Sequence, residues 1–461
     1  MTVVSLGVLG YVVLQLVVGL VVSRRVHTEE EYLVAGRSLG PVLTTASLFA
    51  TWFGAETCLA AAGEVYQRGL YGATADPLAY GASLVLVGLV FAVPLWRRKL
   101  TTLADLFAQR YSGSVERLAA LIAIPSSLIW AAAQVRGFGQ VLASSSALEV
   151  HTAIGLSAAI VVVYTVAGGL LADAVTDVVQ GIALAVGLIV TLVVVTLNLG
   201  GPASTLAAVR PALLPAAATP PGWLEIVNLW AIPVCGSVLA QELVSRLIAS
   251  RSARVARGSA LVAGPLYLLF GAIPVFLGLL GSRLLPGITA PEQVLMRLAQ
   301  EHLPIWVYVL FAGALVSAIL STVDSCLLAA AGLLAHNVIV PLKPGLSDAG
   351  RLRLARLAVV LFGAISYFLA VHADGIYQLV KDASAFGSAG IFVIGLFGLF
   401  SRFGGPPAAT ASLVVGTLGW FAAAYWLKVP YAYLLSLGGA FAAYLVVGFF
   451  ERRPANEPLE R

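Results

Sequence analysis

Seven ionisable side chains interrupt segments of the sequence that are otherwise apolar enough to cross a lipid bilayer. Such residues are costly inside a membrane, so they usually face a polar cavity or a partner of opposite charge. A buried structural pair between Arg136 and one of the acids would account for two of them. Seven together favour a polar pathway through a bundle of helices. They are Glu56, Asp76, Arg136, Asp177, Glu242, Asp324 and Lys381.

Hydroxyl side chains gather in the stretch LVSAILSTVDSC at residues 315–326. A single Ser or Thr in a membrane helix often bonds back to the helix backbone, which is the simpler explanation for each one alone. Ser321 and Thr322 are adjacent, however, and Ala318 lies about one helical turn earlier. These positions could present two hydroxyls and a carbonyl to a hard cation such as sodium, because hard cations take oxygen ligands.

Two apolar segments carry residues that disrupt a helix near their middle. In residues 41–63 the stretch ATWFGAE at 50–56 places β-branched, aromatic and glycine residues together, and in residues 223–249 Pro233 and Gly236 stand in mid-segment. Proline removes a helical hydrogen bond and glycine weakens the helix, so we expect local unwinding, with a simple kink as the alternative. Unwound backbone exposes carbonyls that can coordinate cations, so the first break is a natural partner for the hydroxyl-rich stretch.

The elements that position these residues are membrane-spanning helices. Hydrophobic residues make up 60% of the 461 residues, charged residues make up 11%, and the mean hydropathy is +0.95. A soluble domain has about a quarter charged residues, and a helix needs about 20 apolar residues to cross a bilayer. The fold class is therefore all-α membrane protein. Thirteen spans are predicted, at 2–23, 41–63, 72–95, 117–147, 152–170, 174–199, 223–249, 258–282, 304–338, 355–372, 376–401, 406–427 and 431–450.

Basic residues fall unevenly on the two sides of the predicted membrane. Of the 27 Lys and Arg residues, 20 fall on one side, Arg246 among them, and five fall on the other. By the positive-inside rule the rich side is cytoplasmic, which places the N-terminus outside and the C-terminus in the cytoplasm. The first span is then an N-out anchor rather than a cleaved signal peptide. This distribution explains the net charge of +5 without a nucleic-acid partner. We expect a multi-pass protein of the cell (inner) membrane.

The order of the broken segments indicates an internal repeat. With the first span set aside, each broken segment opens a group of five spans, and an odd number inverts the second group relative to the first. This is the layout of an inverted-repeat secondary transporter, whose site lies at unwound backbone in mid-membrane. The predicted parts are an N-terminal helix and cytoplasmic loop (1–40), the first repeat (41–199), an external connector (200–222), the second repeat (223–401), and two C-terminal helices with a short tail (402–461).

Four stretches resemble the sodium/solute symporter family, whose members have the LeuT-type fold. They are GRSLGPVLTTASLFATWFGAE, YTVAGGLLADAVTDVVQG, SRLIASRSARVAR and GALVSAILSTVDSCLLAAAGLLAHNV, in this order within residues 36–338. The resemblance implies a 5+5 inverted repeat with one extra N-terminal and two extra C-terminal helices. It also implies a sodium site, formed by the carbonyls of Ala50, Phe53 and Ala318 and the hydroxyls of Ser321 and Thr322.

Some members of this family hold a second sodium ion beside an acid of the fifth core helix. The resemblance places it here at Asp177, with Ser321, Asp324 and Ser325 facing that acid. No base is visible near these acids in the sequence. Asp324 stands where some members have a serine, so a proton could take the place of the second ion. Sodium is the expected coupling ion, in one or two copies, and no organic cofactor is expected.

Within the family, the sequence looks most like high-affinity choline transporters, in which aromatic rings enclose a quaternary ammonium. The matching rings are Trp52, Tyr80 and Trp130, and cation–π attraction suits a ligand that cannot donate hydrogen bonds. A further cage tryptophan corresponds to about Ala240 here, which leaves choline itself open. Core packing is the alternative for the rings. Polar residues complete the predicted substrate site, and they are Glu56, Thr57, Gln134, Gln241 and Glu242.

These residues predict a sodium-coupled symporter that imports a small organic solute. We expect a cationic or zwitterionic amine, such as a choline-like compound, a polyamine or an amino acid. A sugar, a monocarboxylate or another neutral or anionic solute is the alternative, although like charges disfavour an anion beside two acids. A transporter-like membrane sensor is a further alternative. An enzyme is not expected, because the sequence has neither a metal-ligand cluster nor a nucleophile motif. The expected partners are the lipid bilayer, the solute and sodium ions, and the oligomeric state is left open.

Overall fold

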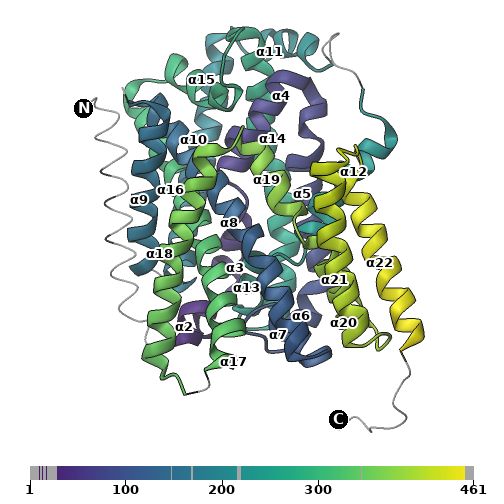
Figure 1. The fold of residues 1–461 in the computed structure, drawn as a ribbon. Coiled ribbons are helices and arrows are strands. Elements are labelled where there is room, and N and C mark those ends of the chain that lie inside the picture. The colour runs from purple at the N-terminus through teal and green to yellow at the C-terminus, as the bar shows by residue number, and fades with distance from the viewer. Residues whose placement is uncertain are drawn as a thin grey trace.

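A computed structural model describes residues 28–146, 148–167, 170–214, 220–343 and 345–451, together with the isolated positions 10, 13 and 17. These residues form a bundle of helices, and among them no β-strand occurs beyond one isolated bridge between Leu39 and Ser250 (Figure 1). Within these described residues, eight helices are long and apolar enough to cross a membrane, or up to ten if each of two bent pairs counts as one span. Apart from these three isolated positions, the predicted first span, 2–23, lies outside the described residues, as does the tail after residue 451.

The first half of the chain supplies the helices from α2 to α10, with short 3-10 or π-helical turns between some of them. Their bounds are α2 (Glu29–Val34), η1 (Ala35–Arg37), α3 (Pro41–Ala50), η2 (Glu56–Ala61), α4 (Ala62–Arg68), η3 (Gly69–Ala73), η4 (Thr74–Ala79), α5 (Tyr80–Leu86), η5 (Val87–Phe91), α6 (Ala92–Arg97), α7 (Ala104–Arg110), α8 (Gly113–Ser144), α9 (Val150–Ala167) and α10 (Leu170–Asn198).

The second half supplies the remaining helices. Their bounds are α11 (Pro202–Val209), η6 (Arg210–Ala212), α12 (Trp223–Gly236), α13 (Gln241–Ile248), α14 (Ala253–Leu284), η7 (Pro291–Gln293), α15 (Val294–His302), α16 (Ile305–Gly332), η8 (Leu333–Ile339), α17 (Val340–Leu342), α18 (Asp348–His372), α19 (Ile376–Ala385), α20 (Ser388–Phe400), α21 (Pro406–Phe421), η9 (Ala422–Trp426) and α22 (Ala432–Phe450).

Both predicted breaks in the helices are present. Helix α3 ends at Ala50, residues 51–54 form turns, and the helix resumes after Ala55. Helices α12 and α13 meet at a bend of 44°. A Cβ on Gly236, the last residue of α12, would lie 2.1 Å from the carbonyl oxygen of Ser384, so only glycine lets α12 approach α19 this closely.

A third bend was not anticipated from the sequence. Helices α19 and α20 meet at 40° around Gly387, whose φ of +67° is a backbone conformation that glycine adopts without a steric penalty. The segment predicted as one span at 72–95 is also irregular, since Asp76 has extended backbone angles inside η4. The predicted connector at 200–222 contains a helix, α11, as well as the turn η6.

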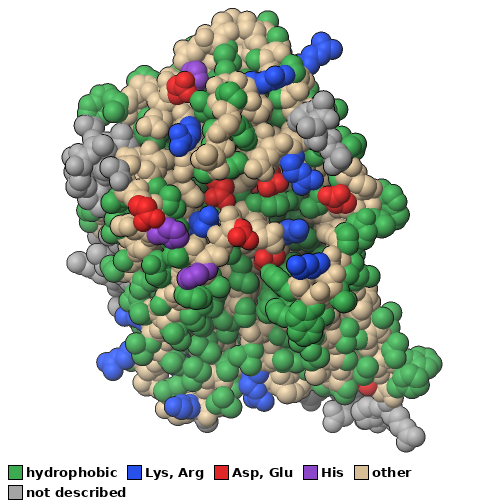
Figure 2. All heavy atoms as spheres, turned by 45° about the horizontal axis from the view of Figure 1, so that its top comes forward, with side chains coloured by type: hydrophobic (Ala, Val, Ile, Leu, Met, Phe, Trp, Pro, Cys, Tyr) green, Lys and Arg blue, Asp and Glu red, His purple; other side chains and the backbone are tan. Residues whose placement is uncertain are grey.

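Helix α16 is enclosed by other helices and is in contact with α8 and α10. Every residue of α16 from Phe311 to Gly332 is buried, so its hydroxyls and its acid are enclosed by other helices rather than by lipid. The flank seen in Figure 2 is mainly hydrophobic, whereas side chains of both charges gather towards the end that carries α11 and α15. An apolar flank around a polar interior is the arrangement of a multi-pass membrane protein.

The loops rich in arginine and lysine lie at one end of the bundle. Helices α6, α7 and α17, which adjoin the arginine- and lysine-rich loops, lie at one end in Figure 1, and α4, α11 and α15 lie at the other. The two sides assigned from the basic residues are thus the two ends of the fold.

Candidate functional site

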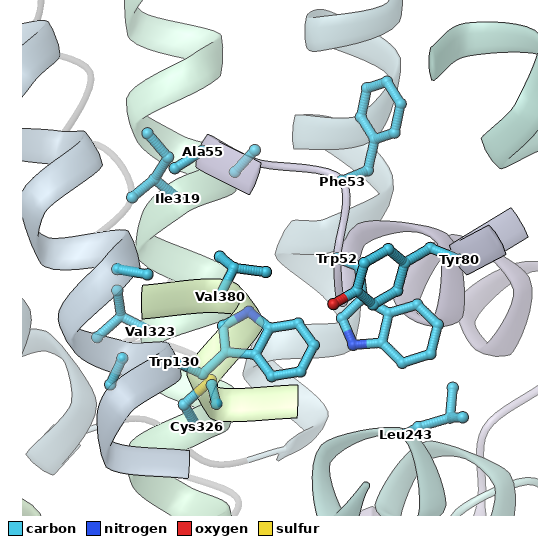
Figure 3. Packing of buried hydrophobic residues seen from close by; sticks show 14 of the residues in the cluster. Trp52, Phe53, Ala55, Tyr80, Trp130, Leu243, Ile319, Val323, Cys326 and Val380 are labelled. Atoms are coloured by element: carbon cyan, nitrogen blue, oxygen red, sulfur yellow. The ribbon is translucent and has the colours of Figure 1, made fainter. Parts of the chain in front are cut away.

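The turn between α3 and η2 brings three aromatic rings together. The Trp52 and Trp130 rings are stacked with centroids 6.1 Å apart, and Tyr80 meets Trp52 edge-on at 5.3 Å and Trp130 at 6.3 Å. Figure 3 shows Trp52 on the non-helical stretch that leads to Phe53, with Tyr80 and Trp130 beside it. Each of the three rings is at most 3% exposed. The rings contact one another directly, so as they stand they leave no gap between their faces for a ligand.

The aromatic cluster, Trp52, Tyr80 and Trp130, separates two cavities. Tyr80 lines one small cavity, of about 20 Å³, and Trp130 lines the other, of about 30 Å³. The Tyr80 hydroxyl lies 2.6 Å from the hydroxyl of Ser384 on α19. Since Ser384 lines the second cavity, this contact links the linings of the two cavities.

Three of the five predicted sodium ligands converge where α3 ends. The Thr322 hydroxyl lies 3.3 Å from the Ala50 carbonyl oxygen and 3.1 Å from that of Ala318. Gly54 packs directly on this group, because a Cβ there would lie 3.5 Å from the Thr322 hydroxyl. Phe53 belongs to the same turn, and its ring packs on Phe49 with centroids 4.5 Å apart.

The other predicted hydroxyl, that of Ser321, faces helix α10. It donates hydrogen bonds to Asp173, at 2.7 Å, and to Asp177, both on α10. Ser325 also donates to Asp173, at 2.6 Å. The predicted second-ion residues Asp177 and Ser325 therefore lie in one buried cluster.

Arg246 occupies the centre of this cluster. Its guanidinium lies 2.8 Å from an Asp173 oxygen and 3.9 Å from an Asp177 oxygen, and its side chain is 1% exposed. The assignment of Arg246 to the basic cytoplasmic side, and the assumption that no base lies near these acids, are wrong. The reason is that all of α13, from Gln241 to Ile248, is buried, so the arginine points into the bundle instead of towards the membrane surface.

Arg246 also joins the two broken spans. Its Nε donates to the Ser47 hydroxyl of α3 at 2.8 Å, and its Nη1 donates to the Glu242 carbonyl of α13 at 3.0 Å.

Asp324 lies on the other side of Thr322 from Ser321 in sequence, and among the described residues neither of its carboxylate oxygens has a hydrogen-bond partner.

The polar residues predicted to bind substrate divide into two groups. Gln134, Gln241 and Glu242 bond to protein groups, since Gln134 accepts from the Ala55 amide at 3.2 Å, Gln241 accepts from the Leu103 amide at 2.7 Å, and Glu242 accepts from Ser127. Gln134 therefore holds backbone at the first break, whereas Gln241, at the start of α13, holds the backbone that precedes α7. Gln241 and Glu242 also line the second cavity.

The other group lies around the first cavity. The Thr57 hydroxyl lies 3.0 Å from an Asp76 carboxylate oxygen and 2.6 Å from the hydroxyl of Tyr267, and Tyr267 itself donates to Asp76 at 3.1 Å. Glu56 is 2% exposed and lines the first cavity, and within the described residues neither of its carboxylate oxygens has a hydrogen-bond partner.

Sequence reasoning missed Asp173, Tyr267 and the partner of Arg136. A signal existed for Asp173, because it lies four residues before Asp177, and residues four apart share one face of a helix. Ser321 and Ser325 have the same spacing on α16, so two matching pairs face each other. Arg136 lies 3.9 Å from Glu292, an acid in the turn η7 rather than one of the acids inside the spans.

Comparison with known proteins agrees with this geometry. The model of the sodium:solute symporter family matches residues 32–416. The high-affinity choline transporter 1 of Caenorhabditis elegans is 27% identical over 380 residues, with 76% of this chain and 63% of that protein covered. The human high affinity choline transporter 1 is 26% identical, with 80% and 70% covered. The chain thus spans less than two thirds of the length of the nematode relative.

Two further comparisons cover nearly the whole chain. The sodium/proline symporter of Haemophilus influenzae is 26% identical, with 97% of this chain and 95% of that protein covered. The structure of a Na+-coupled sialic acid symporter, described as substrate-bound and outward-open, superposes with a TM-score of 0.84 at 19% identity and covers 98% of both chains. At 19% identity the match establishes the fold of this chain and does not identify its solute.

Proposed function

Because the chain belongs to the sodium:solute symporter family, we propose that it is a secondary active symporter that imports a small organic solute together with sodium by alternating access. The family consists of transporters rather than enzymes. The observation that carries the proposal is the set of oxygens from Ala50, Ala318 and Thr322, placed at a break in α3 beside a closed aromatic cluster. Coupling requires an ion site and a solute site that share one mobile element.

We propose thirteen spans in a 5+5 inverted repeat, with the first repeat at 41–199 and the second at 223–401. Helical segments at every predicted span within the described residues support this count, as does the presence of a broken span at the start of each repeat. The basic end of the bundle faces the cytoplasm by the positive-inside rule. The N-terminus is then outside and the C-terminus inside the cell (inner) membrane.

The sodium site consists of the carbonyls of Ala50, Phe53 and Ala318 and the hydroxyls of Ser321 and Thr322. The convergence of Ala50, Ala318 and Thr322 supports it directly. Ser321 supports it because a hydroxyl that donates to a carboxylate keeps lone pairs for a cation. A sodium ion here would hold the end of α3 against α16, so its binding would fix the turn that carries Trp52.

A second cation or a proton joins the cluster around Asp177. Arg246 supplies one positive charge to three nearby carboxylates, those of Asp173, Asp177 and Asp324, so the cluster has room for a further positive charge. Asp324 and Ser325 are the groups on α16 that would hold it. The guanidinium already satisfies Asp173, so Asp177 and Asp324 are the acids left to bind it.

The solute is a cationic or zwitterionic amine. The relatives are named for choline, proline and pantothenate, so the solute must be argued from the cavities. The first cavity is lined by the carboxylates of Glu56 and Asp76 and by one ammonium group, that of Lys381. In a low dielectric such a lining attracts a positive charge. The aromatic cluster and the neighbouring Thr57, Gln134, Gln241 and Glu242 form the rest of the solute site.

A neutral or anionic solute, such as a sugar or a monocarboxylate, is the second candidate. The hydrogen-bonding groups of Glu56 and Asp76 in the first cavity favour a sugar over a monocarboxylate, which the same acids would repel. A transporter-like sensor would bind its ligand at the same place without moving it.

A binding screen tests the proposal. The purified protein is heated with amines, amino acids, sugars or carboxylates, each in sodium and in potassium, and the unfolding temperature is recorded. We expect an amine to raise that temperature in sodium and to have little effect in potassium, because a ligand that binds only the folded state stabilises it. Stabilisation by every ligand to the same extent in both salts would contradict sodium coupling.

A further inference from the structure

The cavity on the Tyr80 side contains an acid whose hydrogen-bonding capacity is unused. Glu56 lines this cavity, is 2% exposed, and among the described residues has no hydrogen-bond partner for either carboxylate oxygen. A carboxylate can accept about four hydrogen bonds, and leaving a buried one without any is costly. An acid in this state is suited to a ligand that donates hydrogen bonds.

The second acid of the cavity, Asp76, differs from Glu56 because hydroxyl groups of the protein lie within hydrogen-bonding distance of its carboxylate. Asp76, 4% exposed, accepts from the Tyr267 hydroxyl at 3.1 Å and lies 3.0 Å from the Thr57 hydroxyl. The protein thus directs two hydroxyls to Asp76, whereas the Tyr80 hydroxyl near Glu56 lies 2.6 Å from the Ser384 hydroxyl and makes no hydrogen bond of normal geometry to Glu56. Of the two acids, Glu56 is the one available to a ligand.

The charges of the cavity favour a positive ligand. Glu56 and Asp76 face one basic side chain, that of Lys381, in the same lining. If all three groups are charged, one negative charge remains in excess. The α12 wall is apolar, from Leu229 and Ile232, and the other polar groups of the lining are the hydroxyls of Tyr80 and Tyr377.

The aromatic cluster argues against a quaternary ammonium as the preferred ligand. Its rings contact one another at centroid distances of 5.3 to 6.3 Å, so no two ring faces are open to a trimethylammonium group between them. A trimethylammonium group also has no N–H, so it would leave Glu56 without a donor. A primary ammonium has three N–H groups and the same charge.

We propose that the cavity between η2, α12 and α19 binds an organic ammonium through N–H donors to Glu56, and that it prefers primary over quaternary ammonium groups. The inference rests on the proposed function, since it specifies the amine that the symporter takes. Tyr80, the member of the aromatic cluster that lines this cavity, lies in the same lining as Glu56. A ligand bound to Glu56 would therefore lie beside the Tyr80 ring, where cation–π attraction adds to the ion pair.

A methylation series tests the inference on the full-length protein in detergent and sodium. Ethanolamine, N-methylethanolamine, N,N-dimethylethanolamine and choline carry one positive charge each, and their N–H count falls from three to none. The dissociation constant of each is measured by calorimetric titration. We expect affinity to fall along the series, with choline at least about tenfold weaker than ethanolamine, because charge-assisted hydrogen bonds to a buried carboxylate are lost.

Two variants assign the preference to Glu56. In Glu56→Gln, which keeps the size of the side chain and removes its charge, the difference between ethanolamine and choline should shrink to less than about threefold. Glu64→Gln is the matched control, since Glu64 lies two turns further along the same helical segment and outside the cavity lining, and it should keep the wild-type series. An unchanged series in Glu56→Gln would overturn the role of Glu56.

The wild-type series alone decides the inference if Glu56→Gln does not fold. Choline binding as tightly as ethanolamine, or more tightly, would overturn the preference for N–H donors and leave amine symport intact. Binding of a neutral sugar or a carboxylate with no binding of any of the four amines would overturn the proposed amine function, and the inference with it. Failure of the preference for N–H donors and failure of the proposed amine symport therefore give different results in the same titrations.

Discussion

The Thr322 hydroxyl of α16 lies 3.3 Å from the carbonyl oxygen of Ala50, the last residue of α3. The contact joins the enclosed helix α16 to the start of the broken segment. Since the broken segment also carries Trp52, an ion bound between these two residues would act on the turn that holds this ring.

Thr322→Ala should weaken sodium activation, because it removes one oxygen from a site that has few. We expect the sodium concentration for half-maximal amine uptake to rise about tenfold, and Thr322→Ser to restore it. The measurement is uptake against sodium concentration in proteoliposomes. Thr191→Val is the control, because the Thr191 hydroxyl donates to the Gly187 carbonyl of its own helix, at 2.7 Å. An unchanged half-saturation value in Thr322→Ala would remove Thr322 from the site.

Ser321→Ala should affect both sodium and the acidic cluster. The hydroxyl donates to Asp173 and Asp177, so its loss leaves these buried carboxylates with one donor fewer. We expect a lower unfolding temperature in potassium and a further deficit in sodium. If the deficit is the same in both salts, Ser321 stabilises the fold and does not bind sodium.

Arg246→Gln should destabilise the protein strongly, because it leaves Asp173 and Asp177 buried without their counter-charge. Breaking a buried ion pair from one side costs about 3–5 kcal/mol. Asp173→Asn in the Arg246→Gln background should recover part of this loss, since the double variant no longer buries that uncompensated charge. The test is a double-mutant cycle in unfolding free energy, and strict additivity of the two changes would contradict a coupled pair.

Trp52→Ala should weaken amine binding several-fold to about thirtyfold, in line with about 0.5–2 kcal/mol for a cation on a ring. Trp52→Phe should be milder, because phenylalanine keeps a π face next to Tyr80. Dissociation constants for ethanolamine in sodium provide the comparison. Equal losses in the two variants would show that the indole contributes packing and not ring electrostatics.

The surroundings of Asp105, on α7, predict that the free energy of unfolding depends on pH. Burial alone would raise its pKa, but the interactions with His336 and the amide hydrogen bonds from Thr101 and Thr102 outweigh it and lower the pKa of Asp105 to about 2. A carboxyl whose pKa falls on folding stabilises the protein above its unfolded pKa of about 3.9, and this contribution of about 2 kcal/mol is lost as pH falls towards 2. Asp105→Asn should therefore lower the unfolding temperature at pH 6.

The deficit of Asp105→Asn should shrink between about pH 4 and pH 2, where the wild-type carboxylate becomes protonated. The measurement is the unfolding temperature of the two proteins across this range. A deficit that is constant with pH would mean that the asparagine fails for steric reasons.

The sequence allowed prediction of the features that follow from local chemistry. The turn at residues 51–54 and the bend after Gly236 occur where helix-breaking residues gather, because their effect on backbone hydrogen bonds is local. The hydroxyls of Ser321 and Thr322 are buried, as expected for polar groups in the middle of an enclosed helix. The convergence of Trp52, Tyr80 and Trp130 was expected only through the family resemblance.

What the sequence did not reveal depends on how segments face one another. The positive-inside count took Arg246 for a cytoplasmic residue, since a count of residues along the chain cannot show that α13 ends inside the bundle. The pairing of Arg136 with Glu292 joins two segments far apart in sequence, and Glu292 lies in a turn between two predicted spans. The unused oxygens of Glu56 are a property of its neighbours in space, so only the assembled helices show them.

Concentrative uptake tests the central claim most directly. Proteoliposomes containing the protein and equal concentrations of labelled ethanolamine inside and outside are given an inward sodium gradient. A sodium-coupled symporter must raise internal ethanolamine above the external concentration and lose that accumulation as the gradient decays, and Thr322→Ala should accumulate less at the same sodium concentration. Internal ethanolamine that never exceeds the external concentration, with the same time course in sodium and in potassium, would contradict sodium-coupled amine symport.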